Sequence, residues 1–231
     1  MPKRFWILYL LGIFLGIVFS ILRIIRVIIV ENQERLVPQE KGLILVCNHP
    51  SKLDPGLAPF LFIWRFIFHP IRFTPWSTPD EKEYYRKWWF YLFRPICISV
   101  DRTDTGRSQA RATRQMLRIL RKGGIIILFI EGTRTFKAIR SGGMLVSATG
   151  KALGISKEGI GFLAIASGAT VVPVWFEETD EIWPNGQVPI PDMTRLPIRI
   201  KIGQGRSFSR EKSQEEVTQE IANALLILAD Q

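Results

Sequence analysis

Short apolar runs alternate with longer stretches of helical periodicity along the chain after residue 38. This alternation is typical of an α/β fold, in which a mixed central sheet is flanked by helices. The apolar runs predict strands at residues 43–47, 96–100, 125–130, 171–176 and 198–202. The helical periodicity predicts helices at residues 80–90, 107–122, 160–167 and 213–229, and Ser213 with Glu216 forms a capping-box pattern at the start of the last one. We therefore expect functional side chains in the loops at the strand ends.

The first thirty residues have a different pattern. Residues 5–22 carry no charge, and the residues among them that are not strongly apolar are Gly12, Gly16 and Ser20. At about 1.5 Å per residue, this run approaches the length of a membrane-spanning helix. Arg23 and Arg26 follow it and could reach toward lipid phosphates, so a shallow helix in one leaflet stays open beside a full crossing. A secretory signal peptide fits less well, because no small-residue cleavage site follows the run.

These patterns predict two parts: an N-terminal membrane-anchoring segment at residues 1–35 and one globular domain of catalytic size at residues 36–231. With 231 residues, of which 47% are hydrophobic, the chain is long enough to bury the core of one such domain. The aromatic-rich residues 57–73 are too short and too often interrupted for a second crossing. They are expected either in the core or at the bilayer interface.

Charge narrows the kind of partner. The chain has 31 Lys and Arg against 21 Asp and Glu, a net charge of +10, which favours nucleic acid, acidic lipid or a phosphorylated substrate. A basic domain next to an apolar segment is expected on the cytoplasmic face of a membrane. In the predicted helix 107–122, arginines stand at positions 107, 111, 114, 118 and 121, a spacing that places them on one face. This face is either simply solvated or contacts acidic headgroups or a phosphorylated carrier.

Candidate chemistry begins in the stretch VCNHPSKLDP, at residues 46–55. His49 stands in a polar turn directly after an apolar run, and Asp54 follows five residues later. A tight turn can bring the carboxylate to one imidazole nitrogen and leave the other nitrogen facing a pocket. Imidazole titrates near neutral pH, so such a pair is suited to general-base chemistry.

Other chemistries fit the sequence less well. His69 is the second of only two histidines and lies in an aromatic run, and no HExxH or cysteine cluster is present, so we expect no metal site. A serine hydrolase would need a nucleophile such as that of a GxSxG turn, which is absent, and Ser51 is read as a turn residue. Cys47 and Cys97 stand in apolar runs and are expected as buried thiols in a reducing compartment.

Four short motifs follow in order along the chain: NHPSKLD, SVDR, FIEGTRT and VVPV. Together they resemble the motifs of the glycerolipid acyltransferase family, which includes 1-acylglycerol-3-phosphate acyltransferases. The resemblance covers residues 43–176. It implies an enzyme that moves a fatty acyl group from acyl-coenzyme A or acyl carrier protein to lysophosphatidic acid, giving phosphatidic acid at a membrane of phospholipid. The acyl carrier is then a co-substrate, no further cofactor is expected, and nucleic acid is not a partner.

The resemblance also implies roles for individual residues. His49 would take the proton from the acceptor hydroxyl, while Asp54 orients the imidazole. Arg102 and Arg134 would hold the glycerol phosphate, because a guanidinium meets phosphate oxygens in a bidentate way. The remaining substrate-binding positions are Glu131, for glycerol or an arginine partner, the Gly132 and Thr133 backbone for close approach, and Pro173 for the shape of the acyl pocket.

The chain departs from the family pattern in two places. Ile130 stands where the third motif usually has proline, and Thr135 stands where it usually has serine. Residues 135–159 are longer than expected between the third and fourth motifs and predict a glycine-rich loop or small hairpin near the site. Two alternatives stay open at this point: acylation or transacylation of another lysophospholipid, and a basic nucleic-acid-binding module.

Overall fold

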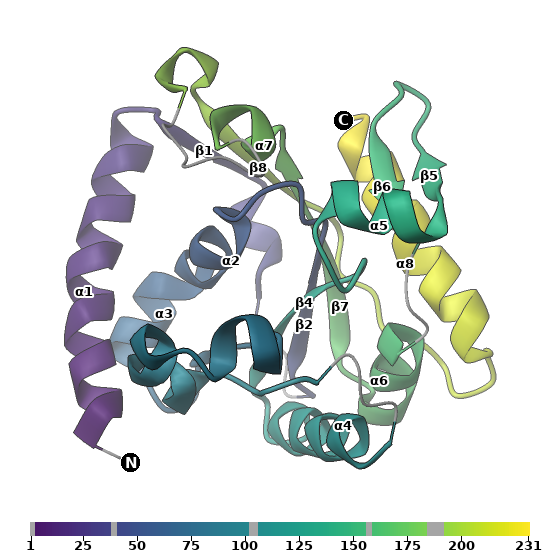
Figure 1. Ribbon diagram of the computed structural model, residues 1–231, viewed down its shortest axis with the longest axis horizontal. Coiled ribbons are helices and arrows are strands. Elements are labelled where there is room, and N and C mark those ends of the chain that lie inside the picture. The colour runs from purple at the N-terminus through teal and green to yellow at the C-terminus, as the bar shows by residue number, and fades with distance from the viewer. Residues whose placement is uncertain (1–2, 38–40, 102–105, 156–158, 184–191) are drawn as a thin grey trace.

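The computed structural model describes residues 3–37, 41–101, 106–155, 159–183 and 192–231. Its centre is a six-stranded mixed sheet, shown in Figure 1. In spatial order the strands are β1 (Ile28–Glu31), β8 (Ile198–Ile202), β7 (Thr170–Glu177), β2 (Leu43–Cys47), β4 (Ile125–Phe129) and β3 (Pro75–Ser77). Neighbouring strands are parallel except for the antiparallel pair β7 and β8. The predicted α/β class with a mixed central sheet is therefore confirmed.

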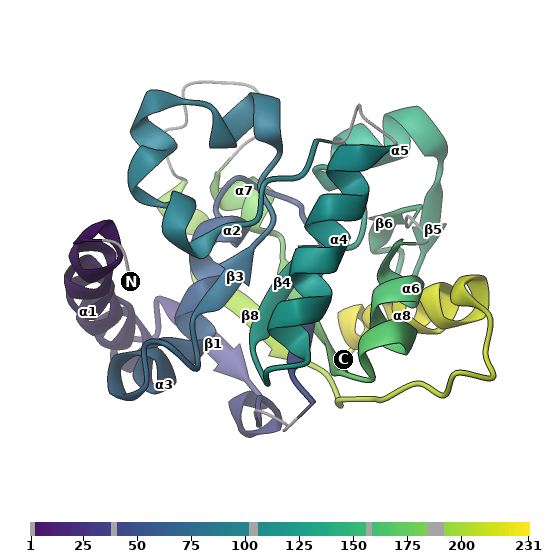
Figure 2. The same ribbon diagram turned by 90° about the horizontal axis from the view of Figure 1, so that it is seen from below.

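Helices cover both faces of the sheet (Figure 2). One face packs against α4 (Arg107–Leu120), α6 (Gly159–Ser167) and α8 (Gln214–Ala229). The other face packs against α1 (Lys3–Ile24) and the short helix η2 (Ala58–Phe62), which follows α2 (Asp54–Leu57). The next helix, α3 (Ile63–Phe68), packs against α1. All five residues of β2 are buried, as expected for a central strand covered on both sides.

A small unit next to the sheet accounts for residues 135–155. It consists of α5 (Thr135–Gly142) and an antiparallel hairpin of β5 (Met144–Val146) and β6 (Ala152–Gly154). The predicted small hairpin is thus confirmed. The remaining short elements are η1 (Gln33–Arg35), η5 (Arg94–Ile96), α7 (Thr179–Ile182) and η6 (Met193–Arg195).

Two predicted elements are wrong in their regular form. The helix expected at residues 80–90 is a π-helical turn, η3 (Glu81–Tyr85), followed by a separate 3₁₀ turn, η4 (Trp88–Leu92). Tyr84 and Tyr85 both donate to the Asp80 carbonyl, which widens the first turn, and Lys87 is extended, which separates the two. The strand expected at residues 96–100 makes only two isolated bridges, from Cys97 and Val100.

The apolar N-terminal run ends earlier than the hydrophobicity alone indicates. Helix α1 stops at Ile24, Arg26 takes a left-handed conformation with φ of 60°, and the following isoleucines form β1 beside β8. The side chain of Arg23 donates to Gln33 in η1. The division at residue 35 stays a prediction, and in the structure the N-terminal segment contributes β1 to the central sheet.

Helix α1 lies along the outside of the domain and packs closely on α3 (Figure 1). A Cβ atom added at Gly16 would stand 2.3 Å from Ile63, and one at Gly12 would stand 3.1 Å from a Phe66 carbon. These glycines therefore let the two helices approach. Among the described residues, α1 is the one helix long and apolar enough to cross a membrane, judged by length and composition.

Candidate active site

Three polar clusters meet at one edge of the sheet because β2, β4 and β7 are parallel neighbours. His49 follows β2, Glu131 follows β4, and Thr179 follows β7. The carboxyl ends of parallel strands share one edge, and this edge is where α/β proteins commonly bind ligands. The strand-end loops thus hold the candidate site, as the sequence predicts.

His49 and Asp54 form a direct pair. The Nδ1 atom of His49 lies 3.0 Å from Oδ2 of Asp54. Asp54 opens α2 directly before Pro55, and the tight turn between β2 and α2 folds its carboxylate back onto the imidazole. This places the two side chains as the sequence predicts.

Two further donors hold the Asp54 carboxylate. The backbone N–H of Ser51 donates to Oδ2 at 2.7 Å, and the Thr179 hydroxyl donates to Oδ1 at 2.5 Å. Asp54 is fully buried, and this burial raises the pKa of its carboxyl above the ordinary value, although the bonds from His49, Thr179 and Ser51 oppose the rise. The carboxylate therefore depends on these donors to carry its charge.

The imidazole of His49 rests on an aromatic ring. Its centroid lies 4.3 Å from that of Phe129 at the end of β4, with an interplanar angle of 32°. The side chain is 15% exposed. Within the described part of the chain no hydrogen bond engages Nε2, so this nitrogen is available to a substrate hydroxyl.

Glu131 is buried and binds the backbone of the turn that carries His49. One carboxylate oxygen accepts from the His49 backbone N–H at 3.1 Å and from the Thr135 hydroxyl at 2.8 Å. The other oxygen accepts from the Gly154 N–H of β6 at 2.7 Å. Burial raises the pKa of Glu131 to about 7, and these three bonds only partly oppose the rise. Glu131 thereby links the histidine turn to the hairpin of β5 and β6.

Two backbone connections fix the turn further. The Asn48 side chain donates to the Phe176 carbonyl at 2.9 Å and accepts from the Phe176 N–H at 2.7 Å. The Thr135 N–H donates to the His49 carbonyl at 2.8 Å. Residues 48–49 are thus held from β7 on one side and from α5 on the other.

The characteristic sequence pattern of acyltransferases matches residues 27–177, more than half of the chain, and this stretch includes His49 and Asp54. The chain belongs to the acyltransferase family. A 1-acyl-sn-glycerol-3-phosphate acyltransferase of Chlamydomonas reinhardtii is 26% identical over 161 residues. That alignment covers 68% of this chain and 40% of the relative, so the chain spans well under half of the relative's length.

The fold agrees with this membership. The crystal structure of the 1-acyl-sn-glycerophosphate (LPA) acyltransferase PlsC from Thermotoga maritima matches with a TM-score of 0.59. The match covers 88% of this acyltransferase chain and 69% of the other, at 21% sequence identity. It therefore supports the arrangement of sheet and helices described above.

Of the two arginines predicted to bind phosphate, the structure describes Arg134. Arg102 lies outside the described residues. Arg134 stands directly before α5, and its guanidinium carbon lies 5.0 Å from the centroid of the Phe136 ring. Gly132 has φ of +67° and donates its N–H to the Phe129 carbonyl, which makes the turn that carries Thr133 and Arg134. The roles of these residues toward substrate stay predictions.

Pro173 is not brought to the histidine. It lies in β7 opposite Val46, on the sheet face that includes Val171 and Trp175. A Cβ atom added at Gly203 would lie 2.6 Å from its ring, which shows that the ring packs against the strand-to-loop connection after β8. Phe129, whose ring contacts the His49 imidazole, packs with the core on the opposite face of the sheet from Pro173. The contribution of Pro173 to an acyl pocket stays a prediction.

Sequence reasoning missed four supporting residues: Asn48, Thr135 as a partner of Glu131, Gly154 and Thr179. Thr179 follows β7 directly, so the rule that places function at strand ends could have singled it out. Gly154 lies in the hairpin that was expected near the site, but its N–H contact has no sequence signal. No group of three or more potential metal ligands occurs in the described ranges. Cys47 and Cys97 are buried free thiols.

Proposed function

We propose that this chain transfers a fatty acyl group from acyl-coenzyme A or acyl carrier protein to the free hydroxyl of lysophosphatidic acid, giving phosphatidic acid. The observation that carries the proposal is the buried His49–Asp54 pair, with Nδ1 bound to the carboxylate and Nε2 open. The two relatives are named as acyltransferases for 1-acyl-sn-glycerol-3-phosphate and LPA, and this supports the choice of acceptor.

In this reaction Nε2 of His49 takes the proton of the acceptor hydroxyl as the oxygen attacks the thioester carbonyl. The new carbon–oxygen bond gives a tetrahedral intermediate, which collapses by breaking the carbon–sulfur bond. The imidazolium returns its proton to the leaving thiolate, so the histidine ends the cycle neutral. Asp54 holds the ring through Nδ1–H and stabilises the positive charge that develops on it.

The phosphate of the acceptor needs cationic partners. Arg134 stands at the site edge in the motif that the resemblance assigns to glycerol phosphate, and we assign the same task to Arg102. A phosphomonoester carries nearly two negative charges near neutral pH, and a guanidinium can bind two of its oxygens at once. This favours lysophosphatidic acid over lysolipids with neutral headgroups.

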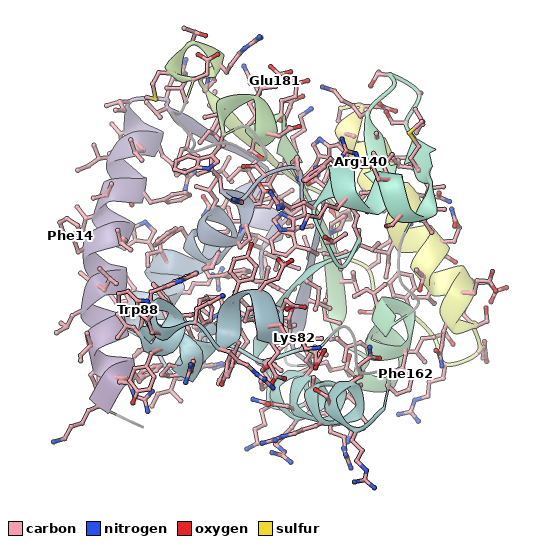
Figure 3. The ribbon with its side chains drawn as sticks, viewed as in Figure 1. Phe14, Lys82, Trp88, Arg140, Phe162 and Glu181 are labelled. Carbon is pink, nitrogen blue, oxygen red and sulfur yellow. The ribbon has the colours of Figure 1, made fainter. Side chains whose placement is uncertain are left out.

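The membrane is the expected place of reaction. Helix α1 packs on the domain with Phe5, Leu8, Gly16 and Phe19, and its opposite side exposes Trp6, Leu10, Phe14 and Ile17. Figure 3 shows Phe14 pointing away from the domain. Because one side of α1 is occupied by the domain along its length, we infer that the helix lies in the interface of one leaflet and does not cross alone.

A transfer assay with the full chain tests the proposal. Labelled acyl-coenzyme A and acyl carrier protein are each offered with lysophosphatidic acid, lysophosphatidylcholine and lysophosphatidylglycerol, and products are separated by thin-layer chromatography. Phosphatidic acid is expected as the main product. His49→Ala is expected to lower turnover by about 10²- to 10⁴-fold, the usual contribution of a general base.

His69→Ala is the matched control, since His69 is the second histidine and contacts Phe73 rather than the site. It should keep the activity of the unsubstituted protein. Undiminished turnover in His49→Ala would contradict the assigned base. Transfer to a lysolipid without a phosphomonoester at the same rate would contradict the assigned acceptor.

A further inference from the structure

The Asp54 carboxylate receives donors from two distant parts of the chain. His49 and Ser51 come from the same turn, and both bind Oδ2. Thr179, 125 positions downstream, binds Oδ1 through its hydroxyl. Both Thr179 and Asp54 are fully buried, so water does not compete for this bond. Within the described residues, Thr179 is the one side chain that holds Oδ1.

The chain makes an unusual turn to place Thr179. Strand β7 ends at Glu177, and Glu178 adopts a left-handed conformation with φ of 49° and ψ of 30°. A non-glycine residue in this region is conformationally costly, and such residues cluster at functional sites. An ion pair between Glu178 and Lys151 stabilises the turn. Helix α7 then begins at Thr179.

Helix α7 also contacts the histidine turn at its other end. The Ser51 hydroxyl donates to the Trp183 carbonyl at 3.5 Å, a long bond, and accepts from the Leu53 N–H at 3.1 Å. The segment after β7 thus touches the turn at both Asp54 and Ser51. Glu131 binds the same turn at another point, the His49 backbone N–H.

We propose that Thr179 is a positioning residue for acyl transfer, whose hydroxyl fixes the Asp54 carboxylate so that His49 presents Nε2 to the acceptor. This inference rests on the proposed function. Thr179 does not touch the reacting atoms, and it acts through Asp54.

The charged surroundings explain why Asp54 needs this donor. His49 faces it from the turn after β2, Glu131 from the end of β4 and Asp180 from α7, and the Cys47 thiol lies nearby in β2. Of these groups only His49 can carry positive charge, while the carboxylates repel a second negative charge. Loss of the Thr179 hydroxyl would leave a buried acceptor unpaired and favour protonation of Asp54. A protonated Asp54 no longer stabilises the imidazolium.

Thr179→Val and Thr179→Ser separate the hydroxyl from the shape of the side chain. In the full chain in detergent micelles, with acyl-coenzyme A and lysophosphatidic acid, Thr179→Val is expected to lower kcat by about 10- to 100-fold, the range for a hydrogen bond to a charged group. KM for both substrates should change by less than about twofold. The acidic limb of the kcat/KM profile should move to higher pH. Thr179→Ser should restore both the rate and the profile.

Thr194→Val is the matched control. Its hydroxyl also donates to a carboxylate, that of Asp192 at 2.6 Å, but on an exposed turn. It should leave rate and pH profile unchanged. If Thr179→Val does not fold, as judged by circular dichroism, Thr179→Ala serves in its place.

A second measurement does not depend on activity. The chain has two histidines, so ¹⁵N-histidine labelling in a His69→Gln background reports on His49 alone. The coupled titration of the His49–Asp54 pair should shift in Thr179→Val and not in Thr179→Ser. An unchanged titration, or a lower rate with an unchanged pH profile, would overturn the inference. A lack of transfer by the unsubstituted protein, with the titration shift present, would instead count against the proposed function alone.

Discussion

Glu131 binds three donors from three segments at a position that water barely reaches. Its side chain accepts from His49, Thr135 and Gly154, and the residue is 2% exposed. The raised pKa of about 7 means that the folded protein binds a proton here more tightly than the unfolded chain does. The contribution of Glu131 to the free energy of unfolding should therefore be highest at acidic pH and fall as the carboxyl ionises.

This linkage predicts a pH dependence for Glu131→Gln. From the ordinary pKa of 4.5 to about 7, the unsubstituted protein should lose on the order of 3 kcal/mol in the free energy of unfolding through this group. Glutamine does not ionise, so the free energy of unfolding of the variant should not show this fall between pH 4.5 and about 7. Urea unfolding at pH 5, 6 and 7.5 measures it.

Glu34→Gln is the control, because Glu34 is an exposed glutamate in η1. It should keep the decline of the unsubstituted protein. Equal slopes in both variants would show that Glu131 is ionised throughout this range.

The chemistry of the site was predictable where it is local and not where it is distant. His49 and Asp54 are five residues apart, so a turn alone brings them together. The contacts of Thr179 and Gly154 join segments far apart in sequence, and only the pairing of β2 with β7 and the folding of the hairpin place them. Contacts between such distant segments leave no periodic pattern in the sequence, so the sequence could not predict them.

At the scale of elements, the close contact between α1 and α3 depends on glycine residues, which have no side chain to keep the two helices apart. Gly12 and Gly16 stand four residues apart and face Phe66 and Ile63. Ser20, one turn further, returns its hydroxyl to the Gly16 carbonyl at 2.8 Å. The three residues that interrupt the apolar run therefore lie on one stripe, and they reflect helix packing more than weak hydrophobicity.

Gly16→Val should disturb this contact. A side chain at this position overlaps Ile63, so the helices must separate, at an expected cost of about 1–3 kcal/mol in unfolding free energy. Gly142→Val is the control, since a Cβ atom there meets nothing within 4 Å. Thermal unfolding of both variants in the same detergent measures the difference. Equal stability of the two variants would mean that α1 does not rest on α3.

Elements with strong periodicity were predicted well. Strands β2 and β8 match their predicted bounds, and α8 begins with the expected capping box at Ser213. Strand β1 was missed because its isoleucines continue the apolar run of α1, and β3 because it has only three residues. The helix expected at residues 80–90 failed because backbone bonds to Asp80 override the side-chain pattern.

At the scale of the whole molecule, the apolar surface and the arginine surface lie on different elements. Helix α1 covers one side of the sheet and α4 the other (Figure 2). The outer side of α1 is apolar, and the arginines of α4 are exposed. Ala112 and Leu120 form the buried side of α4, so the predicted one-sided arrangement of its arginines is present. Whether this arginine face contacts an anionic carrier stays a prediction.

Membrane attachment through α1 can be tested without disturbing the fold. Leu10 and Phe14 are 66% and 62% exposed, so the double change Leu10→Glu with Phe14→Glu should preserve folding. It should weaken binding to anionic phospholipid vesicles at least about tenfold, because two charges at an apolar interface cost several kcal/mol. Sedimentation with vesicles measures the bound fraction.

The control places the same two charges elsewhere. Met193 and Ile227 are exposed apolar residues outside α1, at 63% and 59%. Met193→Glu with Ile227→Glu should leave vesicle binding intact. Equal losses in both double variants would indicate a general effect of charge and would contradict attachment through α1.

Because β8 is antiparallel to β7, the carboxyl ends of the six strands lie at two different edges of the sheet. Strands β1 and β8 run against β7, so their carboxyl ends open on the edge away from His49. The carboxyl ends of β1 and β8 therefore do not join those of β2, β4 and β7 at the edge that holds His49. Substitutions at the carboxyl ends of β1 and β8 should therefore leave turnover intact, even where they alter the part of the sheet that contacts α1.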